Sequence, residues 1–400
     1  LPYLDTSGAP ALDGLKRYHR VKDFRIGGTY DLDDPASYEN GGVGGTTLES
    51  LGLPPVQIGY VTLGTPHRGE DGLIDNAVLV NPYYSGDSTS VLDFWGEMGA
   101  RSGFSEGVHI GSGRFIDTDR QYVILVDALG LWGCSKPSAS HPGCDDSQPL
   151  GLRFPQYRLE DCVQLTYRLL RDALDVHRLE RVTGVSLGAS LTYVWAVMHP
   201  DFMKCIIPIG GTPFQSRGMA RWQFDLMTAC IQSDPVYRET RGDYYHLPHL
   251  ERPIRGNLFG WSLVRQSAYV NELRVEQTPE QYRMEGFDWE DCVDMIASGG
   301  TMPGSGSALF AVALIDSNDL IYRNRAQGLL DVEPELGRVK AKTLIIHVDT
   351  DQWLHPNIAT RAHERIAGSR LLTYPHDMGH YGVFMAPARL AGEIEAFLAH

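Results

Sequence analysis

Short apolar runs bounded by turn-forming residues recur along the chain and predict buried strands. These runs cover residues 56–63, 76–80, 122–126, 181–183, 205–209 and 343–348. Apolar residues at helical spacing predict helices over 159–176 and 187–198, and a last helix over 387–398. Strands that alternate with helices favour an α/β fold, with a mostly parallel central sheet and helices on both of its faces.

One interval breaks this alternation. Between the strands that end at 209 and begin at 343 lie about 130 residues with helical patterning and no clear strand, which is too long for a loop. Methionine and aromatic residues are frequent there, so we expect a helical lid over 212–336. The main α/β domain is then formed by 56–211 and 337–400, and residues 1–55 are expected to form an irregular N-terminal arm.

The sequence Gly184-Val-Ser186-Leu-Gly188 stands directly after a predicted strand and directly before a predicted helix. A serine on such a sharp turn adopts strained backbone angles, and small residues two positions away prevent clashes. The turn lifts the hydroxyl above the sheet, near the positive end of the helix. This pattern is typical of the nucleophile of the α/β-hydrolase fold, which we therefore predict.

A serine nucleophile needs a base, and the base needs an acid to orient it. In the α/β-hydrolase fold these follow in the order serine, acid, histidine, with the acid after a late strand. Asp351 follows the strand 343–348, and His380 follows a glycine near the end of the chain. Asp349 is the competing acid and His376 the competing base, and we favour Asp351 and His380.

Other candidate groups are assigned structural roles. Asp127 follows the strand 122–126 and is expected to be a turn or packing residue. His246 and His249 are three residues apart, but no matching acid accompanies them, so they are poor metal ligands. No HExxH motif is present, and we expect no metal site.

Two backbone amides are needed to stabilise the oxyanion of a tetrahedral intermediate. The amide of Leu187, directly after the nucleophile, should supply one of them. The loop after the strand 76–80 should supply the other, and we favour the amide of Tyr84, since Pro82 has no N–H group to donate.

Charge, apolar run length and cysteine content bear on which partners and which cellular location can be expected. The 400 residues carry a formal net charge of −15, from 50 acidic and 35 basic side chains, which disfavours nucleic acids and anionic membranes. No apolar run is long enough to span a membrane. Cys134 and Cys144 flank a short loop, and either a disulfide or two free thiols is expected. The sequence favours neither a cytoplasmic nor a secreted location.

Several blocks in linked order resemble the homoserine O-acetyltransferase family, a branch of the α/β-hydrolases. The resemblance spans about residues 55–395. It implies the triad Ser186, Asp351 and His380, a helical lid, and dimerisation through that lid. The blocks are 60–64, 75–80, 115–126, 129–138, 152–161, the nucleophile motif with 199–201, 351–356 and 379–380.

The departures from this family bear on the substrate. The family places an arginine on the first lid helix, but residues 227–231 contain none, which leaves Arg217 or Arg221 as substitutes. An aspartate usually follows the catalytic histidine, and here it is Tyr381. Leu187 stands where the acetyltransferases usually have methionine. Without these charges, recognition of a zwitterionic amino acid should fail.

The sequence therefore predicts a carboxylic-ester hydrolase that uses no cofactor and acts on small-molecule neutral esters with small or medium acyl groups. Tyr83 and Tyr381 are expected to line its pocket. The alternative is an acyltransferase that uses acetyl-CoA and an acceptor other than homoserine. A non-catalytic binding module is disfavoured, because serine, acid and histidine are all present in the expected order.

Overall fold

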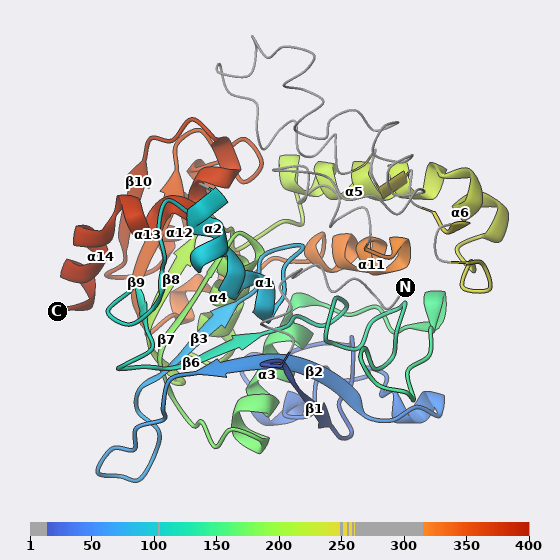
Figure 1. The fold of residues 1–400 in the computed structure, drawn as a ribbon, viewed down its shortest axis with the longest axis horizontal. Helices are drawn as coiled ribbons and strands as arrows, with labels where there is room; N and C mark the ends of the chain where they lie inside the picture. Colours follow the sequence, from blue (N-terminus) through green and yellow to red (C-terminus); the bar gives the residue numbers. More distant parts are fainter. Residues whose placement is uncertain are drawn as a thin grey trace.

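The computed structural model describes residues 14–102, 105–248, 251–253, 256–257, 260 and 315–399. Its centre is a twisted eight-stranded sheet (Figure 1). From one edge to the other the strands are β1 (Arg17–Val21), β2 (Val56–Leu63), β6 (Tyr122–Val126), β3 (Ala77–Asn81), β7 (Leu179–Val185), β8 (Met203–Ile209), β9 (Lys342–Val348) and β10 (Arg370–Tyr374).

The six strands from β6 to β10 in this order are parallel, and β2 runs antiparallel to both of its neighbours. The predicted mostly parallel sheet is therefore confirmed. The expectation of an irregular arm is wrong for 17–21, because these residues form the edge strand β1. This strand was hidden from sequence patterning because its residues, RYHRV, are mostly polar and only one of them is fully buried.

Alternate residues of the central strands enter two separate apolar cores, one on each face of the sheet. Leu79 of β3 and Ile345 of β9 belong to one core, whereas Val78, Val80 and Ile346 belong to the other. Because the side-chain period of a strand is two residues, strands that are apolar throughout must be covered on both faces. This explains the continuous apolar runs in the sequence.

Helices cover both faces (Figure 1). The first core is covered by α3 (Leu159–Asp172), α4 (Leu187–Met198) and α12 (Asn357–Arg365), and the second by α1 (Ser88–Phe94), α13 (Ala386–Arg389) and α14 (Ala391–Leu398). The single last helix predicted over 387–398 is in fact two helices that meet at Leu390.

Three helices of the segment predicted to be a lid lie among the described residues. They are α5 (Gly218–Ser233), α6 (Pro235–Thr240) and α11 (Ser317–Gln327). Figure 1 places α5 and α11 side by side beyond one end of the sheet, and a tyrosine of the β3–α1 loop contacts both of them. Most of the segment between α6 and α11 lies outside the described residues, so the extent of the lid and its use in dimerisation stay predictions.

The described cysteines are free thiols, so the structure favours the second of the two alternatives for Cys134 and Cys144. Cys134 is fully buried, and the Cys144 thiol donates to Gln57 Oε1 at 3.3 Å. Burial raises the pKa of the Cys134 thiol well above its usual range, so this sulfur stays protonated. Cys292 lies outside the described residues.

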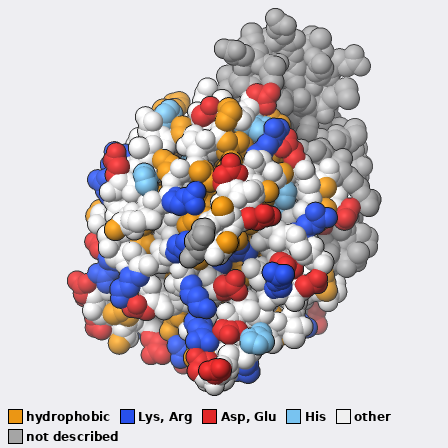
Figure 2. Space-filling view, turned by 90° about the vertical axis from the view of Figure 1, so that its left-hand side faces the viewer, with side chains coloured by type: hydrophobic (Ala, Val, Ile, Leu, Met, Phe, Trp, Pro, Cys, Tyr) orange, Lys and Arg blue, Asp and Glu red, His pale blue; other side chains and the backbone are white. Residues whose placement is uncertain are grey.

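None of the helices among the described residues is both long enough and apolar enough to cross a membrane. Figure 2 shows acidic and basic side chains interspersed over one face, with apolar side chains singly or in small groups. On this face the charges of both signs are therefore mixed, and the acidic side chains do not form one block.

The N-terminal segment is tied to the fold by the buried carboxyl group of Asp161. Asp161, near the start of α3, accepts hydrogen bonds from the amides of Gly27 at 3.0 Å and Arg158 at 2.7 Å, and from the Tyr30 hydroxyl. Asp161→Ala leaves these donors without their acceptor, which should lower the free energy of unfolding by about 3 kcal/mol or more. Urea-induced unfolding measures this loss.

The matched control lies at the other end of the same helix. Asp172 pairs with Arg168 on the surface at 2.8 Å, so Asp172→Ala should cost less than about 1 kcal/mol. Equal losses in the two variants would contradict the anchoring role of Asp161.

Candidate active site

Ser186 lies on a strained turn between β7 and α4. Its backbone has φ 57° and ψ −117°, a left-handed conformation that is rare for a residue with a side chain. Such strain costs of the order of 1–3 kcal/mol and persists only where the surroundings enforce it. Here the Ser186 amide donates to the Ile209 carbonyl of β8 at 2.9 Å, and the Ser186 carbonyl accepts from the amides of Ala189 and Ser190 in α4.

The glycines around Ser186 are required by close backbone contacts. A Cβ atom added to Gly184 would lie 2.6 Å from the Gly188 backbone, and one added to Gly188 would lie 2.6 Å from the Asn81 carbonyl oxygen. At Gly211 an added Cβ would lie 2.6 Å from the Ser186 carbonyl oxygen. The first two are the glycines of the motif, and the third was not singled out in the sequence.

A chain of hydrogen bonds joins Ser186 to the two residues expected to activate it. His380 Nε2 lies 2.8 Å from Ser186 Oγ, and His380 Nδ1 lies 2.6 Å from Asp351 Oδ2. Asp351 and His380 are 1% and 3% exposed, and Ser186 is 7% exposed, so all three are shielded while the serine stays closest to the surface. The predicted nucleophile, base and acid therefore meet in space, although 194 residues separate the serine from the histidine.

Asp351 is held as a carboxylate by its neighbours. Burial by itself raises the pKa of a carboxyl group. Here the electrostatic attraction to His380 and the hydrogen bond from it outweigh burial, and His347 and the Leu354 amide add to their effect. The pKa of Asp351 therefore lies below its usual value. Asp351 Oδ1 accepts from the amides of Trp353 and Leu354, both at 2.9 Å. One oxygen is thus fixed by the loop after β9, and the other is directed at the imidazole.

The competing acid and base, Asp349 and His376, contact each other and are not part of the hydrogen-bonded series from Asp351 to Ser186. Asp349 Oδ1 accepts from the His376 amide at 3.4 Å, and His376 Nδ1 accepts from the Met378 amide at 3.1 Å. Asp127 is also excluded as the orienting acid, because its Oδ1 accepts from the Ser88 amide at 2.8 Å at the start of α1. The structure thus favours Asp351 and His380.

The two predicted oxyanion donors lie on the elements that flank Ser186. Leu187 is the first residue of α4, where amides have no acceptor within the helix and the helix dipole is positive. Tyr84 lies in the loop between β3 and α1. That loop is secured by the Trp132 indole, which donates to the Ser85 carbonyl at 2.7 Å. Whether these amides bind an oxyanion stays a prediction.

Trp353 lies beside the histidine and is part of a cluster of three aromatic side chains. The Trp353 ring lies 5.1 Å from His380, and Tyr84 lies 6.4 Å from Trp353, both measured between ring centroids. Phe224 of α5 stacks on Tyr84 at 6.1 Å and lies 6.4 Å from Trp353. Trp353 was not singled out in the sequence, and Phe224 was considered only as one of the aromatic residues of the predicted lid. The position of Trp353, two residues after the acid, was the one available signal.

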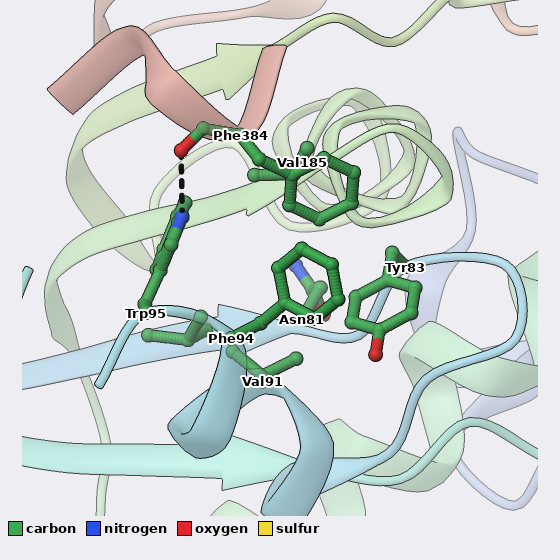
Figure 3. A pocket seen from close by; sticks show the side chains of 8 residues that line it. Asn81, Tyr83, Val91, Phe94, Trp95, Val185 and Phe384 are labelled. Carbon is green, nitrogen blue, oxygen red and sulfur yellow. Dashed lines mark hydrogen bonds between the residues drawn. The ribbon is translucent and has the colours of Figure 1, made fainter. Parts of the chain in front are cut away.

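A small apolar pocket lies between the ends of β3 and β7, α1 and the 3-10 helix that carries His380 (Figure 3). The rings of Tyr83, Phe94 and Phe384 lie close together, with centroids 4.7–5.4 Å apart. Val185, which directly precedes Ser186, lines the same pocket. Its empty space is about 220 Å³ with the open mouth included. Tyr83 was expected to line a pocket, whereas Tyr381 does not line this one.

The charged residues considered as substitutes for the missing arginine are engaged elsewhere. Arg217 pairs with Asp331 and Glu333. Arg221 pairs with Asp225 at 2.8 Å and donates to a backbone carbonyl. Neither guanidinium is directed to the triad by these contacts.

The reactive groups of the site are the side chains of Ser186, His380 and Asp351. Among the described residues, no cluster of three or more His, Cys, Asp or Glu side chains could hold a metal ion. His246 is described, and His249 lies outside the described residues. The arrangement can activate a hydroxyl nucleophile next to an apolar pocket.

Comparison with known proteins finds related chains of two kinds. A homoserine O-acetyltransferase of Symbiobacterium thermophilum is 32% identical over 292 residues, which cover 69% of this chain and 71% of the relative. An ethyl acetate hydrolase of Pseudomonas veronii is 27% identical over 333 residues, which cover 81% of this chain and 84% of the relative. No protein-family profile matches the chain.

Solved structures share the fold. An acetylester hydrolase from Corynebacterium glutamicum superposes with a TM-score of 0.70 at 22% identity, over 96% of each chain. A homoserine O-acetyltransferase from Bacillus anthracis gives 0.71 at 20% identity, over 96% of this chain and 97% of the other. The predicted α/β-hydrolase fold is therefore confirmed.

The close approach of Gly184 to the Gly188 backbone can be tested by measuring the stability of variants. Gly184→Ala forces the Gly188 backbone to move and should lower the free energy of unfolding by about 1–3 kcal/mol. Gly392→Ala is the control, because its added Cβ meets nothing within 4 Å inside α14, and it should be neutral or slightly stabilising. Thermal unfolding of both variants decides this, and a Gly184→Ala protein as stable as wild type would show that the turn is not tightly packed.

Proposed function

The chain belongs to the homoserine O-acetyltransferase-like family of α/β-hydrolases, and within this family we propose that it is a serine-dependent carboxylic-ester hydrolase. The observation that carries the proposal is the unbroken hydrogen-bonded chain from Asp351 through His380 to the strained Ser186. The proposed substrates are small neutral esters, and the proposed reaction needs no cofactor.

The reaction proceeds through an acyl-enzyme. Ser186 Oγ attacks the ester carbonyl carbon while His380 Nε2 takes the hydroxyl proton, and Asp351 holds the imidazole in the required tautomer. The amides of Leu187 and Tyr84 stabilise the oxyanion. His380 then returns the proton to the departing alcohol. Water, deprotonated by His380, attacks the acyl-enzyme and releases the carboxylic acid together with the free serine.

The surroundings of the histidine support an uncharged alcohol group. The leaving oxygen must lie next to His380 Nε2, and the side chains nearest to that ring include Trp353, with Tyr84 and Phe224 behind it. The ion pairs of Arg217 and Arg221 keep these cations from serving a substrate carboxylate. A zwitterionic acceptor such as homoserine would have to be desolvated without compensating charges, which is unfavourable.

The pocket in Figure 3 supports small acyl groups. Its walls come from the residues next to the reacting groups, because Val185 precedes Ser186 and Phe384 follows His380 on the same 3-10 helix. The enclosed part has room for about one water-sized group. The methyl group of an acetyl ester is therefore expected to fit this part, and longer acyl chains to fit less well.

The second candidate is an acyltransferase that takes its acyl group from acetyl-CoA. It is favoured by the sequence relationship, since the Symbiobacterium relative at 32% identity is a homoserine O-acetyltransferase. The triad would form the same acyl-enzyme, and an alcohol would replace water in the second step. Dimerisation through the lid is likewise carried over from the family as a proposal.

Turnover of p-nitrophenyl acetate separates the two candidates. We expect steady turnover in buffer alone that homoserine does not accelerate, and a loss of at least about 10⁴-fold in Ser186→Ala. A burst of one equivalent followed by a stall that an added alcohol relieves would instead indicate the acyltransferase. Turnover that Ser186→Ala retains would contradict both.

Asp351→Asn tests the orienting acid. The amide keeps the shape of the carboxylate but stabilises the wrong imidazole tautomer, so kcat should fall by about 10⁴-fold while the fold is kept. Steady-state kinetics with p-nitrophenyl acetate, alongside circular dichroism, provide the measurement. As a control, Asp349→Asn, which alters the competing acid, should leave kcat within about threefold of wild type, since its contacts lead away from His380.

Phe94→Ala tests the acyl pocket. Removing this ring, which packs against both Tyr83 and Phe384, should raise kcat/KM for butyryl and hexanoyl esters relative to acetyl esters by about tenfold or more. The control is Phe94→Leu, which removes less volume and should give an intermediate shift. An unchanged chain-length profile in both variants would show that acyl chains do not enter this pocket.

A further inference from the structure

We infer that the hydrogen bond from the Tyr84 hydroxyl to Asn324 positions the oxyanion donor, so that helix α11 determines how well the transition state is stabilised. The inference rests on the proposed function, in which the Tyr84 amide is one of two oxyanion donors. Tyr84 and Asn324 are then linked as positioning residues: the amide of Tyr84 meets the substrate, and its side chain fixes where that amide lies.

The contact is short and enclosed. The Tyr84 hydroxyl donates to Asn324 Oδ1 at 2.5 Å, and the two residues are 4% and 2% exposed. The Asn324 amide group in turn donates to Thr228 Oγ1 of α5 at 3.2 Å. Burial raises the pKa of Tyr84, so its phenol stays protonated and serves as a donor throughout the neutral range. A hydrogen bond that is shielded from water in this way fixes direction as well as distance.

Helix α11 is itself firmly attached to the main domain. Arg323, next to Asn324, is buried and donates to the Leu129 carbonyl at 3.2 Å. One turn earlier, Asp319 accepts from Ser138 Oγ at 2.6 Å and pairs with the buried Lys136 at 3.3 Å. These contacts join α11 to the loop that follows β6. Asn324 is therefore presented from a fixed support, although it belongs to the segment predicted to be a lid.

The rest of the β3–α1 loop is anchored separately. Trp132 holds the Ser85 carbonyl, and Asp127 accepts from the Ser88 amide at 2.8 Å. Residues 85–88 are thus held by the main domain, whereas the Tyr84 side chain is held by contacts with α5 and α11. Oxyanion stabilisation depends on donors placed to within a fraction of an ångström, so loss of the second anchor should affect catalysis more than folding.

Tyr84→Phe and Asn324→Ala test this coupling. Each should lower kcat for p-nitrophenyl acetate by about 10- to 100-fold with KM little changed, because the donor acts in the transition state. The double variant should lose no more than either single variant, since both remove the same hydrogen bond. A trifluoromethyl ketone, whose hemiketal oxygen uses the oxyanion donors, should bind more weakly in proportion to the loss in kcat/KM, and acetate binding should not change.

The matched control breaks a similar bond elsewhere on α11. The Tyr237 hydroxyl of α6 donates to Asn318 Oδ1 at 3.0 Å, and both residues are buried. Tyr237→Phe should reduce thermal stability about as much as Tyr84→Phe while leaving kcat and the binding of the ketone unchanged.

The outcomes separate this inference from the proposed function. If wild type turns over the ester and Ser186→Ala does not, but Tyr84→Phe has the kcat of Tyr237→Phe, the positioning role is overturned and the proposed function stands. Additive losses in the double variant would also overturn it. If wild type itself turns over no ester and is not inhibited by the ketone, the proposed function has failed and the inference fails with it.

Discussion

The backbone at Ser186 is held in a left-handed conformation that a serine does not adopt freely, and the rest of the site depends on that constraint. Its amide is tied to β8 and its carbonyl to the first turn of α4. Glycines at 184, 188 and 211 allow the neighbouring backbones to approach closely enough to enforce it. The strain directs the hydroxyl away from the sheet and places it 2.8 Å from His380 Nε2.

The parallel sheet supplies the remaining geometry. Because parallel strands all end at the same edge, the loops after β3, β7 and β9 meet there, and they carry Tyr84, Ser186 and Asp351. Helices α5 and α11 approach this edge from beyond the sheet and contact Tyr84. Aromatic side chains gather there, and this favours the proposed neutral ester over a charged amino-acid substrate. The polarity of the site, more than the triad, thus distinguishes the proposed esterase from a homoserine acetyltransferase.

The fold class and the meeting of Ser186, His380 and Asp351 could be predicted from the sequence, because both follow from local signals. Buried strands consist of runs of apolar residues, and the nucleophile turn needs glycines at fixed spacing. The edge strand β1 was missed because its side chains are mostly polar and partly exposed. Asn324 was missed for a different reason: its partner Tyr84 is 240 residues away, and neither residue belongs to a motif. Contacts between distant segments leave no periodic pattern in a single sequence.

The central claim is that Ser186 is the nucleophile, and covalent labelling tests it most directly. The protein would be treated with a serine-reactive phosphonate ester, and the site of modification identified by mass spectrometry of the intact chain and of its peptides. The account predicts one adduct per chain, on the peptide that contains Ser186, and none in Ser186→Ala. Labelling that persists undiminished in Ser186→Ala, or an adduct that maps to another residue, would contradict it.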